Sequence, residues 1–278
     1  MKWTEEEIQI LRDNYTKSSK KEISKLLPNR NYSTIIKQAA YRQISKKREF
    51  YSCDLKYFSV PNINNNYWAA FIGADGYLAK NRYQLSIGIS NKDKTLLENL
   101  KQNLKITNPI WDKYKKCFNK TFHHIRLDWN VNNDYYKDLN KYWNITSCKS
   151  LTLEPPNITN SEQQLSYIIG YLDGDGCISL LKRRNTKQFL SFNIVGTKEL
   201  LIWISEILYN FENKTKYKKP LQIGKKYKNV NCYSIAAEHQ RAYKILKLLE
   251  EIKTPFKLPR KWNKIKEYEG YNENSFNI

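Results

Sequence analysis

Several patterns that define large classes of protein are missing from this sequence. No stretch approaches the roughly 20 consecutive apolar residues of a membrane-spanning helix, so no membrane span is expected. The five cysteines are scattered and include no C-x-x-C pair, which supports neither a zinc knuckle nor a disulfide framework. The first residues, MKWTEEEIQI, lack the apolar segment of a signal peptide. We therefore expect an intracellular protein, in the cytoplasm or nucleoid or in an organelle with an AT-rich genome.

Acidic residues are scarce relative to basic ones. The chain of 278 residues holds 48 Lys and Arg against 27 Asp and Glu, a formal net charge of +21 (48 − 27). A charge of this size favours a polyanionic partner, most often nucleic acid. The chain is also rich in Lys, Asn, Ile and Tyr, as an AT-rich gene would encode, so part of the charge reflects codon bias on solvated faces.

Histidine is also scarce, which limits the kinds of metal site that the chain could form. Only His239 accompanies the adjacent pair His123 and His124. Neighbouring residues of a strand point to opposite faces, so the pair could not converge on one ion. We therefore discount an HNH-type nuclease site.

Residues 1–47 have the pattern of a separate helix-turn-helix-like domain, followed by a linker at 48–66. Thr4 and Glu7 match the capping box T-x-x-E at the start of a first helix. Two more helices are predicted near 20–27 and 32–44. The stretches WTEEEIQIL and EISKLLPNRNYSTIIKQAAYR resemble Myb/SANT-like helix-turn-helix domains. A small bundle with a solvated face is the alternative. Residues of the third helix expected to contact DNA are Lys37, Gln38, Tyr41 and Arg42.

The remainder of the chain repeats one order of elements, in halves spanning 67–160 and 161–278. Each half reads helix, two strands, helix, two strands and helix, with Ser161 and Gln164 as a capping box for the second. We therefore predict an α+β fold, in which two pseudo-symmetric αββαββα halves form antiparallel β-saddles. The strands are predicted near 77–80, 83–90, 110–116, 122–130, 177–182, 188–195, 221–226 and 230–236, with the last helix at 238–252.

Apolar and polar residues alternate along the predicted strands. Leu85, Ile87 and Ile89 share one face, and polar or small residues lie between them. One face of each sheet should therefore pack on a core, while the other is polar and basic. Solvent exposure is the usual outcome for such a face, but the net charge of +21 favours contact with nucleic acid. The residues expected to contact DNA are Lys80, Arg82, Gln84, Ser86, Ser90, Lys113, Lys115, His124, Arg126, Arg183, Arg184, Lys187, Ser191, Asn193, Gln222 and Lys226.

Two apolar helices end in the same way, one repeat apart. WAAFIGADG covers residues 68–76 and YIIGYLDGDG covers 167–176, so 100 residues separate Asp75 from Asp175 (175 − 75). Each aspartate is followed by a glycine, Gly76 or Gly176, which is typical of the end of a helix.

Small residues on these helices indicate that the two pack closely. Ala69 and Gly73 lie four residues apart, as do Gly170 and Gly174, so each pair shares one side of its helix. Glycine inside a helix costs about 0.8–1 kcal/mol relative to alanine, and close helix packing would explain that cost. If the helices pack side by side, their terminal aspartates meet at the same end.

Two carboxylates beside the carbonyls of two helix C-termini repel one another unless a cation lies between them. Oxygen ligands favour Mg²⁺ over zinc. The expected ligands are Asp75 and Asp175, with the backbone carbonyls of Ala74 and Gly174. A single Asp-Gly pair is usually only a turn, but repetition of the whole helix ending favours a site. Asp173 has no acidic counterpart in the first half and is expected to be structural.

The two stretches resemble the LAGLIDADG motif of homing endonucleases, and the order of elements over residues 67–265 agrees with that family. The resemblance implies a monomer that lies on double-stranded DNA. It also implies Mg²⁺-dependent cleavage of both strands, with Asp75 and Asp175 as the essential acids. The first copy departs from the motif at Gly73, where the family has aspartate; that position is not a metal ligand in the family.

Members of this family often place a lysine near the active site after the last helix of each half. Lys149 in SCKSLTL and Lys261 in FKLPRKW match this position, and the resemblance implies that they polarise water or balance phosphate charge. Arg260 lies beside Lys261. Surface lysines of a lysine-rich chain are the alternative. A protein of the same fold that does not cut DNA, such as an intron RNA maturase or a DNA-binding regulator, is the alternative function.

Overall fold

The computed structural model divides the chain into two units, Met1–Tyr51 and Ser52–Ile278. Each has a hydrophobic core of its own. No helix in the part of the chain that the structure describes is both long and apolar enough to cross a membrane. The structure describes residues 2–44, 51–79, 84–128, 135–183, 187–212, 219–228 and 230–276.

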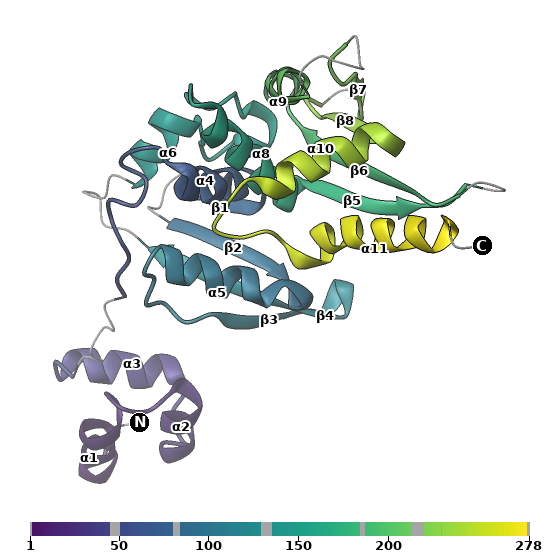
Figure 1. Ribbon diagram of the computed structural model, residues 1–278. Coiled ribbons are helices and arrows are strands. Elements are labelled where there is room, and N and C mark those ends of the chain that lie inside the picture. Colours follow the sequence, from purple (N-terminus) through teal and green to yellow (C-terminus); the bar gives the residue numbers. More distant parts are fainter. Residues whose placement is uncertain are drawn as a thin grey trace. The chain divides into compact units, whose positions relative to one another are not determined.

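The N-terminal unit contains three helices, α1 (Glu5–Asn14), α2 (Lys20–Leu26) and α3 (Tyr32–Tyr41) (Figure 1). The predicted capping box is confirmed, because the side chains of Thr4 and Glu7 accept hydrogen bonds from each other's backbone N–H. Glu7 also pairs with Arg30 at 2.7 Å, and this hydrogen bond is the main reason that the pKa of Glu7 falls to about 2. The buried core of the unit is Leu11, Tyr15, Ile23, Leu27, Ile35 and Ala39.

The larger unit contains the repeat that the sequence predicts. Its first half consists of α4 (Ile63–Asp75), β1 (Gly76–Leu78), β2 (Gln84–Ser90), α5 (Lys94–Asn103), β3 (Trp111–Lys115), β4 (Lys120–Asp128), α6 (Tyr135–Trp143) and the short α7 (Lys149–Thr152). Its second half consists of α8 (Ser161–Asp175), β5 (Gly176–Leu181), β6 (Phe189–Gly196), α9 (Lys198–Phe211), β7 (Ile223–Lys225), β8 (Tyr233–Glu238), α10 (His239–Glu251) and α11 (Pro259–Phe276).

Each half forms a four-stranded sheet, and the two sheets have the same topology. The strand order is β1-β2-β4-β3 in one and β5-β6-β8-β7 in the other, with every pair antiparallel. Alternate residues of the central strands are buried, including Leu85, Ile87 and Ile125 in the first sheet and Phe192 and Ile194 in the second. The predicted α+β class and the two antiparallel sheets are confirmed.

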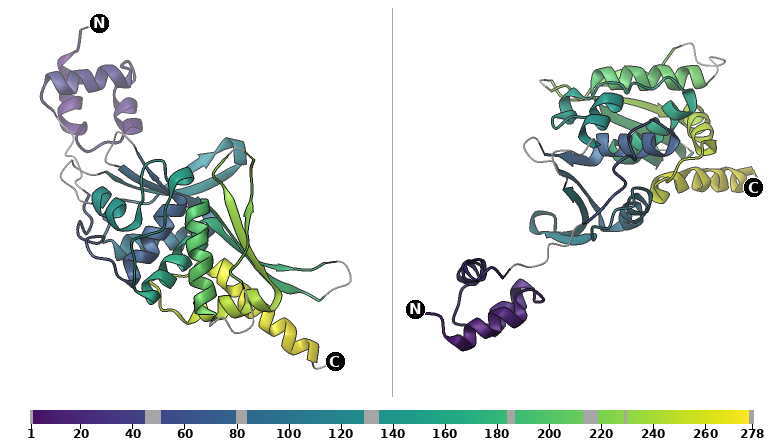
Figure 2. Two further views of the ribbon diagram at one scale, coloured as in Figure 1. Left: turned by 90° about the horizontal axis from the view of Figure 1, so that it is seen from above. Right: turned by 90° about the vertical axis from the view of Figure 1, so that its left-hand side faces the viewer.

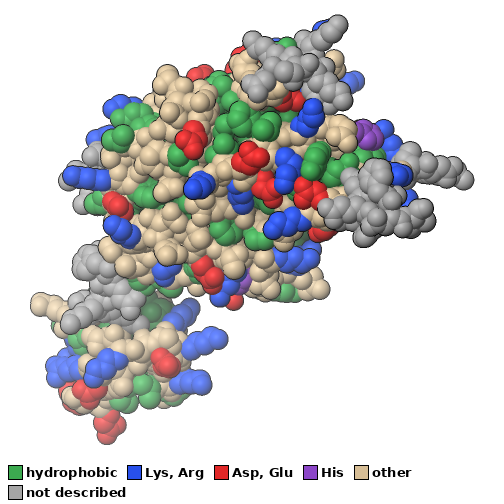
Figure 3. Space-filling model, in the orientation of Figure 1, with side chains coloured by type: hydrophobic (Ala, Val, Ile, Leu, Met, Phe, Trp, Pro, Cys, Tyr) green, Lys and Arg blue, Asp and Glu red, His purple; other side chains and the backbone are tan. Residues whose placement is uncertain are grey.

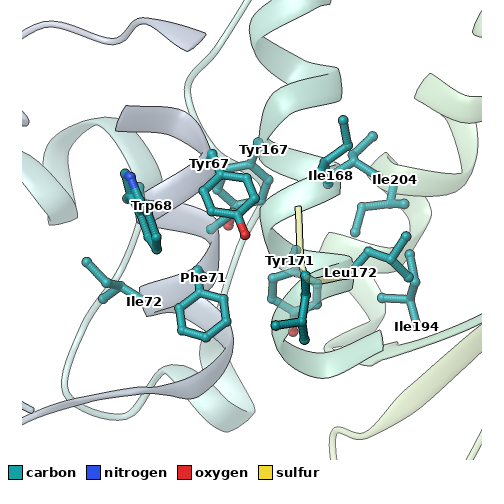
Figure 4. Packing of buried hydrophobic residues seen from close by; sticks show 14 of the residues in the cluster. Tyr67, Trp68, Phe71, Ile72, Tyr167, Ile168, Tyr171, Leu172, Ile194 and Ile204 are labelled. Carbon is teal, nitrogen blue, oxygen red and sulfur yellow. The ribbon is translucent and has the colours of Figure 1, made fainter. Parts of the chain in front are cut away.

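The helices α4 and α8 lie side by side at the centre of this unit (Figure 1). Their apolar side chains also fill the core on either side, as Figure 4 shows for Trp68 and Ile72 of α4 and for Ile168 and Leu172 of α8. A Cβ atom added to Gly170 would lie 2.2 Å from the carbonyl oxygen of Tyr67. The absence of a side chain there therefore lets the two backbones approach, as the sequence predicts for α8.

Gly73 of the small-residue pair predicted in α4 does not make the close contact between the helices. A Cβ atom on Gly73 would meet only side-chain atoms, at 3.5 Å or more, whereas one on Gly174 would lie 2.3 Å from Cβ of Ala74. The close contact of α4 therefore involves Ala74. Ala69 and Gly73 have the right spacing, but sequence spacing alone does not say which side of a buried helix faces its neighbour.

The glycines that follow the two helices have a steric reason. Gly76 and Gly176 have φ values of −73° and −103°, so neither adopts the left-handed conformation common at helix ends. A Cβ atom on Gly76 would lie 2.7 Å from the carbonyl oxygen of Ile72, and one on Gly176 would lie 2.5 Å from that of Leu172. At both glycines the backbone passes directly from a helix into a strand, and no side chain would fit there.

The predicted linker at 48–66 is wrong over its second part. α4 begins at Ile63, capped by Asn62, and Phe58 is fully buried against the rings of Tyr135 and Trp143, with centroids 5.1 and 5.5 Å away. Polar residues in this segment misled the prediction, because Asn65 is buried and donates to the backbone carbonyls of residues 57 and 60.

Three other predicted features differ from the structure. Asn160 caps α8, so the predicted capping box of Ser161 and Gln164 is wrong. Glu238, the predicted start of the last helix, ends β8 instead. A further helix, α11, follows that predicted helix, and Figure 2 shows it at the C-terminal end of the chain. The buried residues Trp262, Ile265 and Tyr268 follow its helical period.

The segment that follows α7 in the first half and the segment that follows α10 in the second half each cross to the other half. In the first, the carbonyl of Leu153 accepts a hydrogen bond from the Thr197 hydroxyl. In the second, Phe256 stacks on Trp68 with ring centroids 6.4 Å apart. The two halves therefore exchange their connecting segments as well as packing through α4 and α8.

Candidate active site and nucleic-acid interface

The C-terminal ends of α4 and α8 present Asp75 and Asp175, the last residue of each helix. Both side chains reach solvent. The surrounding protein still removes enough water to raise the pKa of each carboxyl above its ordinary value. For Asp75 the second cause is the charge of Asp175, and nearby cations oppose both effects: Lys261, Lys149 and Arg260.

Lys149 lies buried at the end of α4. Its Nζ donates to the carbonyl oxygens of Gly73 and Ala74, each at 2.7 Å, and only 6% of the residue is exposed. Burial lowers the pKa of Lys149, and the carboxylates of Asp175 and Asp75 oppose that effect. A cation at this position offsets the negative end of the helix dipole.

Lys261 occupies the corresponding position at the end of α8. Burial lowers its pKa too, while Asp173 acts in the opposite direction. The interpretation of these two lysines as ordinary surface residues is therefore wrong. The carbonyl oxygens that accept hydrogen bonds from Lys261 Nζ, at 2.6 to 3.3 Å, belong to Leu172, Asp173, Gly174 and Gly176.

Asp173 is buried and fully engaged by the protein. It accepts hydrogen bonds from the Tyr67 hydroxyl at 2.7 Å, from the Leu258 N–H at 2.9 Å and from Trp262 Nε1 at 2.8 Å. Burial raises its pKa, and these donors oppose the rise. The structural role expected for this residue fits its contacts, because it joins α4, α8 and the start of α11.

The donor atoms at the two helix ends are all oxygens. Two solvent-accessible carboxylates, with the carbonyls of Ala74 and Gly174 beside them, fit a hard divalent cation such as Mg²⁺. Each of these carbonyls already accepts a lysine hydrogen bond. Among the described residues no group of three or more His, Cys, Asp or Glu side chains could hold a metal.

A cavity of about 220 Å³ opens beside Asp75. It is lined from the first half by Gly88, Ser90 and Asp93, and from the second half by Arg260. In the sequence, Arg260 is marked only by its position next to Lys261. Its partner Asp93 lies 167 residues away in the chain, and no local pattern connects the two.

The predicted contact residues of the first sheet that the structure describes share its solvent-facing side. Strand pairing places Ser86 opposite Arg126 and Gly88 opposite His124 on this face. Two aromatic residues there were missed: Tyr77 lies opposite Ser86, and Trp111 opposite His124. Both are exposed large side chains. Tyr77 lies between the buried residues Gly76 and Leu78, and that alternation could have identified it, whereas no residue of β3 is buried and no such signal marks Trp111. The predicted residues on this face are Gln84, Ser86, Ser90, Lys113, Lys115, His124 and Arg126.

The second sheet has an equivalent face. On this face Ser191 lies opposite Ser179, and Asn193 lies opposite Cys177. The sequence analysis did not predict Ser179 or Cys177 as contact residues. Gln222 and Lys226 are exposed next to the ends of β7, and Lys187 is exposed before β6. Arg183 is held by Glu238 at 2.7 Å, so its charge is already partly balanced. Lys80, Arg82 and Arg184 lie outside the described residues.

The N-terminal unit exposes part of α3. Lys37 and Tyr41 are exposed and Gln38 is half-buried, with 81% of Tyr41 accessible to solvent. Arg42 caps the end of the helix instead of lying within it, and it is half-buried. Lys and Arg side chains are spread over the surface of both units on the face that Figure 3 shows.

No protein-family model matches the chain, and no curated protein sequence matches it. Among solved structures, a double mutant of I-SmaMI shares 15% identity over 76% of this chain and 90% of its own, with a TM-score of 0.50. I-SmaMI bound to an uncleaved DNA target with calcium ions has 15% identity, the same coverages and a TM-score of 0.46. The I-LtrWI LAGLIDADG homing endonuclease bound to target DNA has 12% identity over 78% and 89%, with a TM-score of 0.45. At these identities the likeness is one of fold, the fold of I-SmaMI.

Proposed function

We propose that this chain is a LAGLIDADG homing endonuclease, a monomeric enzyme that binds a specific double-stranded DNA site inside the cell and cuts both strands. One observation carries the proposal: two accessible aspartates end a pair of closely packed helices, and a buried lysine lies at each helix end. Sheet faces with polar, basic and aromatic side chains flank the pair. This combination suits phosphodiester hydrolysis at one fixed place on a bound duplex.

The aspartates and the lysines of the site have different roles in this proposal. Asp75 and Asp175, with the carbonyls of Ala74 and Gly174, would hold Mg²⁺, which when bound supplies positive charge that stabilises the oxygens of the reacting phosphate. Lys149 and Lys261 donate hydrogen bonds to the backbone carbonyls at the ends of α4 and α8 and so hold these helix ends in place. They also place two further positive charges near the phosphates. Substitution of either lysine should therefore affect both the position of the carboxylates and the charge of the site.

The sheet faces supply specificity in this proposal. Side chains of Gln84, Ser86, Arg126 and Asn193 carry hydrogen-bond donors and acceptors that can read base edges, while lysines contact phosphates. Sequence-specific contact would hold the duplex in one register over the two aspartates. A single cut position in each strand then follows.

The test begins with a supercoiled plasmid library that carries a randomised segment. Cleaved ends produced by the full-length protein are captured and sequenced with Mg²⁺ or Ca²⁺ present. We expect one family of sites to be linearised with Mg²⁺ only. Asp75→Asn and Asp175→Asn should each slow double-strand cleavage more than about 100-fold, because several kcal/mol of charge stabilisation is lost. Affinity for the selected site should stay nearly unchanged.

Asp13→Asn makes the same chemical change in the N-terminal unit and serves as the control, with wild-type cleavage expected. Specific binding without cleavage under any metal condition would indicate a regulator or a splicing factor of the same fold. Wild-type cutting by both aspartate variants would show that the active site lies elsewhere.

A further inference from the structure

The guanidinium of Arg260 is held by a buried acid of the other half. Arg260 Nε donates to both carboxylate oxygens of Asp93, at 2.8 and 3.0 Å. Asp93 lies in the turn between β2 and α5, and only 6% of the residue is exposed. Because an unpaired buried carboxylate is strongly unfavourable, this pair should hold Arg260 in one position.

The remaining donors of Arg260 are available to a ligand. Its two terminal nitrogens donate to no other group among the described residues, and 53% of its side chain is exposed. Arginine presents paired N–H donors in a plane, which is the arrangement that phosphate oxygens accept best. The side chain is thus anchored at Nε and open at its outer end.

Arg260 and the first aspartate, Asp75, border the same cavity. Its volume is about 220 Å³, and Ser90 and Asp93 line it as well. The charge of Arg260 also lowers the pKa of Asp75, after the larger effects of Lys261 and Lys149. The cavity therefore combines an acid from one half with a cation from the other.

The second aspartate has different surroundings. The cations that lower the pKa of Asp175 are Lys149, Lys261 and Lys226, and Lys226 is a solvent-exposed residue after β7. An arginine fixed by a buried carboxylate thus stands beside one aspartate, and an exposed lysine beside the other. The pseudo-symmetry of the molecule is broken at the candidate site itself.

We propose that Arg260, positioned by Asp93, binds the DNA phosphate next to Asp75 and so supports cleavage of one strand only. This inference rests on the proposed function. It makes the second half contribute directly to the cut made at the first half's carboxylate. The cut at Asp175 would proceed without Arg260.

The first test measures each strand separately on a plasmid that carries the selected site. Arg260→Gln should slow one strand by roughly 10- to 100-fold, the range expected for loss of a charged hydrogen bond, so that nicked circles with one defined nick accumulate. Arg260→Lys, which keeps the charge, should give a smaller defect on the same strand. Lys244→Gln, a change at an exposed position of α10 outside the candidate site, is the control and should leave both strands unaffected. Equal slowing of both strands by Arg260→Gln, or no slowing, would overturn the proposal.

The second test measures binding and does not require cleavage. Each backbone phosphate around the selected site is neutralised in turn as a methylphosphonate, and affinity is measured without divalent metal. Neutralisation of one phosphate, on one strand, should weaken binding by the wild-type protein but leave binding by Arg260→Gln unchanged. Additive losses at every position would show that Arg260 touches no phosphate. A chain that binds but never cuts would disprove the proposed function and still allow this outcome to be read.

Folding is controlled with a paired variant. Arg260→Gln alone leaves Asp93 without its partner, whereas Asp93→Asn with Arg260→Gln replaces the ion pair by two amides. The double variant should melt near the wild-type temperature and retain the one-strand defect. Recovery of normal cutting on both strands in the double variant would reduce Arg260 to a structural link between the halves.

Discussion

Gly88 of β2 makes room for the ring of His124 on the neighbouring strand. A Cβ atom on Gly88 would lie 2.2 Å from Cε1 of that ring. On its other side the ring stacks on Trp111, with centroids 5.9 Å apart and planes 21° from parallel. Burial lowers the pKa of His124, and Lys115 and Lys113 lower it further. A neutral imidazole is thus fixed on the face proposed to read bases.

Gly88→Ala should displace His124 and change base preference over one part of the target. A well-placed side-chain contact discriminates between bases by about 1–3 kcal/mol, so one or two positions of the selected site should become more tolerant. Gly224→Ala is the control, because its added Cβ would meet only Ser234, at 3.9 Å. The measurement is the profile of cleaved sites for each variant. Identical profiles for Gly88→Ala and wild type would exclude His124 as a base reader.

Among the elements, the pair α4 and α8 sets the geometry of the candidate site. Gly170→Ala should destabilise the larger unit by about 1–3 kcal/mol, because the new Cβ would clash with the Tyr67 carbonyl and force the helices apart. Gly73→Ala should be neutral or stabilising by up to about 1 kcal/mol, since its Cβ has space and alanine favours a helix. Urea unfolding of the full chain measures both. A similar loss in the two variants would mean that the close contact is not at Gly170.

The sequence predicts those elements whose pattern is local. Alternation identified the strands, and the repeated ending identified Asp75 and Asp175. The start of α4 was missed because buried asparagines imitate a linker. The Asp93–Arg260 pair could not be predicted, because its members belong to different halves and only the folded chain brings them together. The roles predicted for Lys149 and Lys261 rest on a family resemblance, whereas their burial is visible only in the structure.

At the scale of the whole molecule, the N-terminal unit has a core of its own and calls for a separate role. We predict that it binds duplex DNA next to the main site through Lys37, Gln38 and Tyr41 and takes no part in cleavage. A tethered second module raises affinity through effective concentration. Deletion of residues 1–47 should therefore weaken binding and reduce its salt dependence, because phosphate contacts are lost.

Affinity at several salt concentrations, with mapping of the cleaved ends, tests this prediction on full-length and truncated protein. The cut positions should stay the same. Equal affinity and equal salt dependence would leave the N-terminal unit without a role in DNA binding, and a shifted cut would show that it sets the register.

The exchange of connecting segments between the halves has a consequence for inheritance. Asp93 of the first half meets its arginine only in the second half, so neither half forms this ion pair by itself. Mutation at either position leaves a charge without its partner, so the two sites should be under joint selection. In an alignment of descendants of this chain, columns 93 and 260 should therefore covary across the 167 residues between them.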